Sequence, residues 1–341
     1  MTPLPDPDDP AALLARMRAL IARGEAESAL AIARDAIAGA PSSALVRAIG
    51  HHVFAEGIDG FHVDMLRDEA RTAAYAGAIA RLAPGRRVLD IGTGSGLLAL
   101  LAARAGAHHV YACEADSRLA LTAREIVAAN GLADRVTVLP LHSDELDRDA
   151  HLGGGVDLVL SELFSQDLLG EGVLRTLADV RARLCLPGAR FLPARAAIRV
   201  ALADFAGSPP TLGEVAGCDL GPFNRHAPAQ EPLRQGRRDC ALRSAPADLF
   251  ALACDGASPR EARARRPLAS TGGRVTGLVQ WIRFETAPGL VYENAPAPGA
   301  ESSHWVLVHH RLPRPIATAP GDLVPVHGWY SDETLLVWCG D

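Results

Sequence analysis

The sequence predicts a doubly wound α/β domain, preceded by a short helical extension and followed by a mainly antiparallel β domain. From residue 86 onward, apolar strand segments alternate with amphipathic helices, which is typical of a parallel sheet covered by helices. After Pro193 the helices give way to strands separated by proline and glycine turns. The 341 residues suffice for two domains and a small addition. We therefore expect three parts, at residues 1–48, 49–192 and 193–341.

The composition excludes several classes of protein. The net charge of −6 lacks the basic excess of a nucleic-acid-binding protein, and the basic residues are all arginine. None of the six cysteines stands in a C-x-x-C pair, which argues against a zinc site or a disulfide framework. The acidic, proline-rich start lacks the features of a signal peptide, and the longest apolar stretch is too short to span a membrane. We expect a cytoplasmic protein that binds neither nucleic acid nor membrane and holds no metal.

The first forty residues indicate two helices. One apolar stripe at helical spacing marks the first of them: Leu13, Leu14, Met17, Leu20 and Ile21. Gly24 interrupts the pattern, and a second helix runs over residues 27–40 to Pro41. The pair resembles a single tetratricopeptide hairpin without a second copy, so we expect a packed extension rather than a repeat array.

The α/β domain is expected to contain four buried strands, at residues 86–92, 109–114, 135–141 and 156–162. Three helices are expected with them, at residues 96–106, 117–130 and 172–184. Ser117 is the candidate cap of the second helix, and Gly131 is its stop signal.

The β domain is expected to contain five strands, at residues 196–205, 274–285, 303–312, 321–330 and 334–341. Between the first two lies a stretch, residues 256–273, that is rich in arginine: Arg260, Arg263, Arg265 and Arg266. We expect this stretch to be a solvated loop.

A glycine-rich loop, "VLDIGTGSG", follows the first strand of the α/β domain and opens a helix. Gly92, Gly94 and Gly96 give the spacing G-x-G-x-G, and glycine lets a backbone approach a ligand closely. The dinucleotide fingerprint G-x-G-x-x-G differs, because its third glycine position is Leu97 here. Asp90 at the strand tip disfavours a pyrophosphate and can attract the ammonium group of an amino-acid moiety.

Acidic residues follow the next two strands. Glu114 ends the second strand, where a carboxylate can accept hydrogen bonds from both ribose hydroxyls. Ser143 and Asp144 follow the third strand and can meet an adenine edge. With the glycine loop, this pattern favours S-adenosyl-L-methionine over NAD as the cofactor. A domain of the same type that binds another nucleotide is the alternative.

Two glutamates stand nine residues apart in "SELFSQDLLGEG". Glu162 ends the fourth strand, at the sheet edge that faces the ligand in open α/β folds, and Glu171 lies between two glycines. Two carboxylates can bind the planar, five-donor guanidinium of arginine and leave one nitrogen free. Singly, Glu171 could be an exposed loop acid and Glu162 a helix cap; a metal site lacks companion ligands.

These motifs resemble those of the protein arginine methyltransferase family, over residues 58–200 well and over the second domain thinly. "FHVDMLRDEARTAAYAGAI" is similar to the helix that precedes the family's nucleotide loop, and "SELFSQDLLGEG" to its double-glutamate loop. "SHW", residues 303–305, resembles a loop of its β-barrel. "CDLGPFNRHAP", residues 218–228, falls at its dimerisation arm.

The resemblance implies a Rossmann-like cofactor domain, a β-barrel-like domain for substrate and dimerisation, and a homodimer. It implies that Arg71 holds the cofactor carboxylate, that Met65 packs near the reacting methyl group, and that His304 pairs with Asp68. The family's upstream Tyr-Phe-x-x-Tyr pattern is replaced by "HVFAE", without either tyrosine. The acidic residue Glu56 in that stretch resembles what is found in the branch of the family whose product is monomethylarginine.

We therefore expect an S-adenosylmethionine-dependent arginine N-methyltransferase. Glu162 and Glu171 would bind the guanidinium of a protein, peptide or free arginine, and Asp68 and His304 would brace the site. The alternatives are a methyltransferase of a natural product or ribosomal protein, and an inactive binding module of the same fold.

Overall fold

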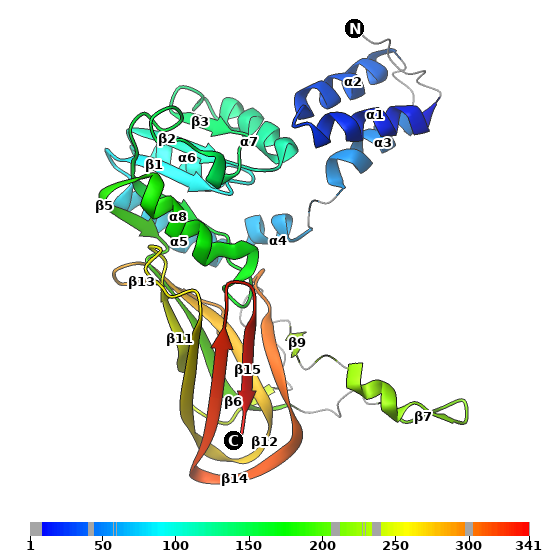
Figure 1. Ribbon diagram of the computed structural model, residues 1–341, viewed down its shortest axis with the longest axis vertical. Helices are drawn as coiled ribbons and strands as arrows, with labels where there is room; N and C mark the ends of the chain where they lie inside the picture. The colour runs from blue at the N-terminus through cyan, green and yellow to red at the C-terminus, as the bar shows by residue number, and fades with distance from the viewer. Residues whose placement is uncertain are drawn as a thin grey trace. The chain divides into compact units, whose positions relative to one another are not determined.

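A computed structural model describes most of the chain: residues 9–39, 44–56, 58, 60–205, 212–226, 228, 230–233, 240–296 and 303–340. The chain divides into two compact units (Figure 1). The first unit comprises Met1–Asp64, Ala76–Glu162 and Asp179–Phe191. The second comprises Met65–Tyr75, Leu163–Ala178 and Leu192–Asp341. No helix among the described residues is long and apolar enough to cross a membrane.

Three N-terminal helices pack around one small core (blue in Figure 1). They are α1 (Pro10–Ala22), α2 (Ala26–Gly39) and α3 (Ala44–Ala55). The core consists of seven buried side chains: Leu13, Met17, Leu20, Ala29, Ile32, Ile49 and Val53. The expected hairpin is present as α1 and α2. The boundary expected after residue 48 falls inside α3, because Ile49 and Val53 share a helical face that the hairpin covers.

The first unit contains a five-stranded sheet of order β3-β2-β1-β4-β5. Its strands are β1 (Arg87–Ile91), β2 (His109–Cys113), β3 (Val136–Leu139), β4 (Val156–Ser161) and β5 (Cys185–Leu192). β1 pairs in parallel with β2 and β4, and β2 pairs in parallel with β3. The order changes direction at β1, so the loop after β1 lies where such folds bind ligands. The predicted parallel sheet is confirmed, but β5 was missed because its Pro187-Gly188 pair indicates a turn.

Helices accompany this sheet in the order that the sequence predicts. They are α5 (Glu69–Leu82), α6 (Leu97–Arg104), α7 (Ser117–Ala129) and α8 (Val173–Arg183), with the short α4 (Phe61–Arg67) before them. Asp116, not Ser117, caps α7: its side chain accepts from the backbone N–H groups of Arg118 and Leu119 at 2.8 and 3.3 Å. Aspartate is as good a cap as serine, and Asp116 stands one residue earlier.

The second unit contains an eight-stranded antiparallel sheet. Its main path is β10 (Cys240–Leu242), β6 (Arg195–Phe205), β12 (Ala262–Ala287), β14 (Leu307–Tyr330) and β15 (Leu335–Cys339). β11 (Ala247–Ala253) pairs with β6, β13 (Leu290–Glu293) with β12, and β9 (Gln230–Leu233) with β14. A small hairpin of β7 (Glu214–Val215) and β8 (Cys218–Asp219) stands in a separate sheet before the short helix η3 (Gly221–His226). The antiparallel second domain is confirmed.

Only the first part of the arginine-rich stretch, residues 256–261 with Arg260, is a loop. Residues 262–273 belong to β12, where Arg263 pairs with Trp329 and Arg265 with His327 of β14. For residues 262–273 the predicted loop was wrong, because it gave the charges more weight than the alternation of alanine and arginine, which has the period of a strand. Arg263, Arg265 and Arg266 are nevertheless exposed to solvent. The two strands expected at 303–312 and 321–330 are likewise parts of one strand, β14.

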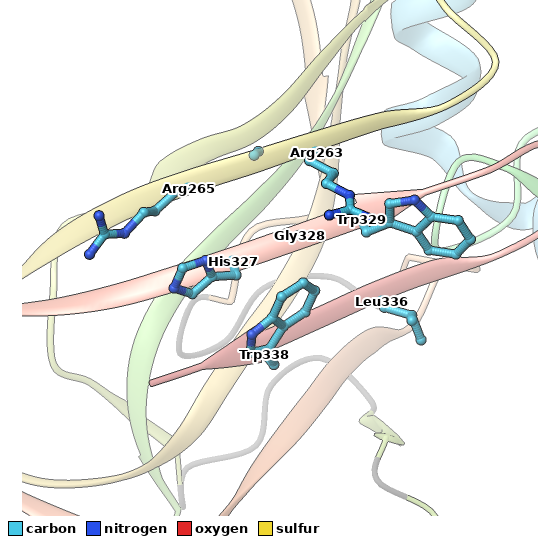
Figure 2. A pocket seen from close by; sticks show the side chains of 8 residues that line it. Arg263, Arg265, His327, Gly328, Trp329, Leu336 and Trp338 are labelled. Atoms are coloured by element: carbon cyan, nitrogen blue, oxygen red, sulfur yellow. The ribbon is translucent and has the colours of Figure 1, made fainter. Parts of the chain in front are cut away.

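This part of the sheet forms a groove of about 590 Å³ (Figure 2). Arg263 and Arg265 line one side, and Trp338 of β15 lines the other. The ring of His327 stacks on that of Trp338, with centroids 5.4 Å apart and planes at 12°. The exposed arginines of β12 therefore lie beside aromatic rings of β14 and β15.

Candidate active site

The glycine loop after β1 is built from backbone conformations that favour glycine. Gly92, Gly94 and Gly96 have φ values of 64°, 53° and 81°. Asp90, only 1% exposed, accepts a hydrogen bond of 2.6 Å from the Thr93 hydroxyl. No described atom outside the neighbouring residues lies within 4 Å of where a Cβ on Gly94 would stand. The loop thus presents bare backbone at the carboxyl end of β1.

Glu114 is fixed by two backbone groups at the end of β2. Its Oε2 accepts from the N–H of Gly94 and its Oε1 from the N–H of Asp116, both at 2.9 Å. The residue is 9% exposed. Each carboxylate oxygen accepts about two hydrogen bonds, so one position on each oxygen is left after these contacts. That pair of acceptors has the chemistry to bind the two hydroxyls of a ribose.

Ser143 and Asp144 lie on the short helix η1 (Ser143–Glu145) after β3. Ser143 is buried, and its carbonyl oxygen accepts from Arg183 Nη2 at 3.1 Å. Asp144 is exposed and lies 2.6 Å from His142 Nδ1, a contact that holds the pKa of its carboxyl below the usual value. Arg183 thus anchors the turn that carries both residues.

Asp68 is the hydrogen-bonding centre of a cluster in the second unit. It separates α4 from α5, so the helix expected over residues 61–79 is divided in two. Its side chain accepts from the Arg71 N–H at 2.9 Å, as a helix cap does, and from the Tyr292 hydroxyl at 3.0 Å. The Nδ1 and backbone N of His304 lie 3.1 and 3.2 Å from Asp68 Oδ2. The structure therefore brings Asp68 and His304 together across 236 residues of sequence.

The environment of Asp68 keeps its carboxylate ionised. Burial alone would raise its pKa, but the hydrogen bonds from His304, Arg71 and Tyr292 outweigh burial and lower the pKa to about 2. The same burial raises the pKa of the Tyr292 hydroxyl well above its ordinary value, so that it remains a donor to Asp68. Sequence reasoning missed Tyr292, which stands in a short strand without any motif.

Trp305, next to His304, connects this cluster to the double-glutamate segment. Its Nε1 donates to the Phe164 carbonyl oxygen at 2.7 Å, and its own carbonyl accepts from Asn294 Nδ2 at 3.0 Å. Gln280 Nε2 makes a second contact, 3.3 Å long, to the carbonyl oxygen of Gln166. Trp305, in the loop before β14, and Gln280 of β12 thus hold the backbone that follows Glu162.

The segment also fixes its own shape. The Ser165 hydroxyl donates to Asp167 and accepts from the Gly170 N–H at 3.0 Å, while Asp167 accepts from the Leu169 N–H at 3.2 Å. Leu168 is fully buried with φ 64°, a conformation rare for leucine. Glu162 directly follows β4 and is half-buried, and Glu171 lies in the short helix η2 (Gly170–Gly172). A packed turn therefore separates the two glutamates.

We expect Gly170→Ala to disturb this turn. A Cβ at residue 170 would stand 2.8 Å from Ser165 Cβ and 2.9 Å from its Oγ, so Ser165 must move and lose its contacts. We expect methyl transfer to fall at least tenfold, with stability lowered by about 1–3 kcal/mol. Steady-state kinetics and thermal unfolding measure both effects. Gly213→Ala, where nothing lies within 4 Å of the added Cβ, is the matched control, and wild-type kinetics in Gly170→Ala would contradict the prediction.

Met65 and Arg71 lie on the two helices that flank Asp68. Met65 is half-buried on α4. Arg71 on α5 is 2% exposed, and its guanidinium carbon lies 5.2 Å from the centroid of the Tyr75 ring. A cation on an aromatic face is stabilised by the ring quadrupole. This buried arginine is a fixed positive charge suited to a carboxylate ligand.

The most informative comparison is with a bacterial enzyme. This chain is 35% identical over 286 residues to the arginine N(omega)-methyltransferase of Streptomyces achromogenes subsp. streptozoticus, covering 81% of this chain and 78% of the relative. The chain belongs to the arginine N-methyltransferase family. Other members of the family match smaller parts. Probable protein arginine N-methyltransferase 6 of Arabidopsis thaliana is 39% identical over 145 residues, 42% of this chain and 32% of its own length.

Two further matches cover different lengths of this chain. Protein arginine N-methyltransferase 7 of Drosophila sechellia is 35% identical over 199 residues, 55% of this chain and 29% of its own length. This chain thus spans about a third of these plant and insect relatives. The model of the ribosomal protein L11 methyltransferase family matches residues 78–183.

Solved structures share the fold. The PRMT1 enzyme–prozyme heterotetrameric complex of Trypanosoma brucei with AdoHcy superposes with a TM-score of 0.69 at 25% identity, over 79% of this chain and 87% of that one. The protein arginine methyltransferase 10 of Arabidopsis thaliana gives 0.64 at 21% identity, over 82% and 95%. The two-part architecture is therefore that of the family.

Proposed function

We propose that this protein transfers a methyl group from S-adenosylmethionine to a guanidinium nitrogen of arginine. The observation that carries the proposal is the fixed turn between Glu162 and Glu171, held by its own hydrogen bonds and by Trp305 and Gln280. Such a turn fixes the backbone that leads from Leu163 to the segment carrying Glu171. Membership of the arginine N-methyltransferase family supports the same reaction.

Each group of the cofactor has a candidate partner in the chain. Asp90, Glu114, Ser143, Asp144 and the glycine loop would bind the adenosine and ammonium groups; Arg71 would bind the carboxylate, and Met65 would pack near the sulfonium. The fixed, half-satisfied carboxylate of Glu114 fits a ribose, and the buried charge of Arg71 fits a carboxylate. When bound, S-adenosylmethionine supplies an activated methyl group.

The chain's own part in the reaction is to bind and orient the acceptor. Glu162 and Glu171 accept hydrogen bonds from two edges of the guanidinium, whose charge persists in proteins because its pKa exceeds 12. Holding charge at those edges leaves electron density on the remaining nitrogen, which is the nucleophile. Orientation of this nitrogen is the main contribution to the rate. Asp68 and His304 support the site as positioning residues.

The acceptor is the arginine of a protein or peptide, or free arginine. Mass spectrometry after incubation with labelled S-adenosylmethionine, free arginine and an arginine-rich peptide tests this directly. A mass gain of one methyl group on either acceptor supports the proposal and identifies the acceptor class. A second methyl group would overturn the monomethyl product suggested by Glu56. Cofactor binding without any mass gain would refute the arginine reaction and favour another acceptor.

We also propose that the protein is a homodimer that uses the segment from β7 to η3. This segment exposes apolar side chains, among them Phe223, which is 63% exposed. We expect Phe223→Asp to convert a dimer into a monomer, because a buried unpaired carboxylate is costly in an interface. Light scattering at micromolar concentration measures the mass. Leu323→Asp, an equally exposed position on β14, is the control; an unchanged mass of Phe223→Asp would contradict this role of the segment.

A further inference from the structure

Arg118 of α7 joins the N-terminal helices to the loop beside Glu114. Although charged, Arg118 is only 9% exposed. Its Nη1 donates to the carbonyl oxygens of Val53, at 3.0 Å, and of Glu56. Its Nε and Nη2 bind the two carboxylate oxygens of Asp116 at 3.0 and 2.5 Å. All of these residues belong to the first unit.

The contacts to Val53 and Glu56 lie at the end of α3. The last carbonyl groups of a helix have no partner within the helix, and a positive charge is favourable there. The side chain of Glu56 is held in turn by α1: its two oxygens each lie 2.7 Å from a guanidinium nitrogen of Arg18. The end of α3 is therefore clamped from α1 and from α7.

Asp116 carries the clamp to the cofactor residues. Its side chain caps α7, and its own N–H donates to Glu114 Oε1 at 2.9 Å. The other oxygen of Glu114 accepts from the Gly94 N–H of the glycine loop. An unbroken series of contacts thus runs from Arg18 through Glu56, Arg118 and Asp116 to Glu114.

We propose that the helical extension acts on the cofactor site through this series, with Arg18 and Arg118 as positioning residues for Glu114 and the glycine loop. The proposal rests on the cofactor role proposed for Glu114. Asp116 must keep its backbone position for its N–H to hold Glu114, and the bidentate contact from Arg118 fixes it.

Both ion pairs of the series persist around neutral pH. Hydrogen bonding to Asp116 raises the pKa of Arg118, and hydrogen bonding to Arg18 lowers the pKa of Glu56. Both shifts favour the charged forms that the two ion pairs require.

The test is the affinity of full-length variants for S-adenosylmethionine, measured by calorimetry. We expect Arg118→Gln to weaken binding and raise KM for the cofactor by about tenfold, with kcat within about twofold, because orientation of Glu114 and not the chemistry is affected. Arg118→Lys should recover part of the affinity, since lysine keeps the charge but not the bidentate contact. Arg104→Gln is the matched control: Arg104, an exposed arginine of α6, donates to Asn130 at the end of α7, and this variant should bind as the wild type does.

Arg18 and Glu56 provide an independent test of the series. We expect Arg18→Gln and Glu56→Gln each to weaken binding about threefold, and the double variant no more than either single one. A lower melting temperature of Arg118→Gln with unchanged affinity and KM would overturn the proposal and leave Arg118 a structural role only. Failure of the wild type to bind S-adenosylmethionine would overturn the proposed function as well, so the two failures are distinguishable.

Discussion

Replacing either glutamate of the pair by glutamine is expected to reduce methyl transfer about 100-fold or more. Glu162→Gln and Glu171→Gln keep the size of the side chain but remove the charge that binds and polarises the guanidinium. Glu162, after β4, and Glu171, in η2, both adjoin a turn that is held by its own hydrogen bonds. The backbone conformation should therefore be retained in both variants. Transfer to the acceptor identified by mass spectrometry, at saturating cofactor, measures the effect.

Cofactor affinity separates this mechanism from a general loss of structure. Calorimetry should give both variants a dissociation constant for S-adenosylmethionine within about threefold of the wild type, because neither glutamate is assigned to the cofactor. Glu333→Gln, an exposed glutamate in the turn before β15, is the control and should keep full activity. Full activity in either pair variant would contradict the two-carboxylate mechanism.

Asp68→Asn is expected to have the largest effect on stability. Asp68 accepts hydrogen bonds from Arg71, Tyr292 and His304 while almost fully buried. The amide offers one acceptor oxygen and places an NH₂ donor where a second acceptor was needed, so buried donors lose their partner. We expect a loss of about 3 kcal/mol. Urea-induced unfolding measures it, and Asp149→Asn, at an exposed aspartate beside Arg148, should change little.

The effect of Asp68→Asn on the free energy of unfolding is expected to depend on pH. The pKa of Asp68 is about 2 in the folded protein, whereas the ordinary pKa of an aspartate, which applies to the unfolded chain, is 3.8. The folded state therefore favours the ionised carboxylate. Its contribution is complete above about pH 5, falls as the unfolded carboxyl takes up a proton near pH 3.8, and is lost as the pH falls through 2, where the folded carboxyl also takes up a proton. The stability difference between wild type and Asp68→Asn should therefore shrink from pH 5 toward pH 2. A difference that stays constant over this range would contradict the assigned ionisation.

Much of the fold could be predicted because local patterns and the final structure agree. The four strands of the parallel sheet are short apolar runs bounded by turn residues, and the glycine loop stands where the sheet order changes. β5 and the start of β12 escaped prediction for opposite reasons. The Pro-Gly pair inside β5 is a typical turn signal, so no strand was predicted there. The arginines at the start of β12 are typical of an exposed loop, so a loop was predicted instead of a strand.

The site could be predicted only where a motif marks it. Asp90 lies near the end of β1, and Glu114 and Glu162 directly follow β2 and β4, so their positions in sequence already suggest their surroundings. Arg118 and Tyr292 carry no such mark. Arg118 donates hydrogen bonds to carbonyl groups that lie 62 and 65 residues away in the sequence. The Tyr292 hydroxyl donates to Asp68, which lies 224 residues away. Contacts of this kind depend on tertiary packing and have no local signal.

The discontinuous makeup of the second unit has a consequence for synthesis on the ribosome. Its segment Met65–Tyr75 is made early, but the sheet that supplies Tyr292 and His304 is made last. At the usual rates of elongation, Asp68 waits more than ten seconds for these partners. During that time the nascent chain has a carboxylate whose final hydrogen-bond donors do not yet exist. A gene truncated before β13 would therefore leave the second unit unable to complete this cluster, and the two units are not separable as consecutive fragments of the chain.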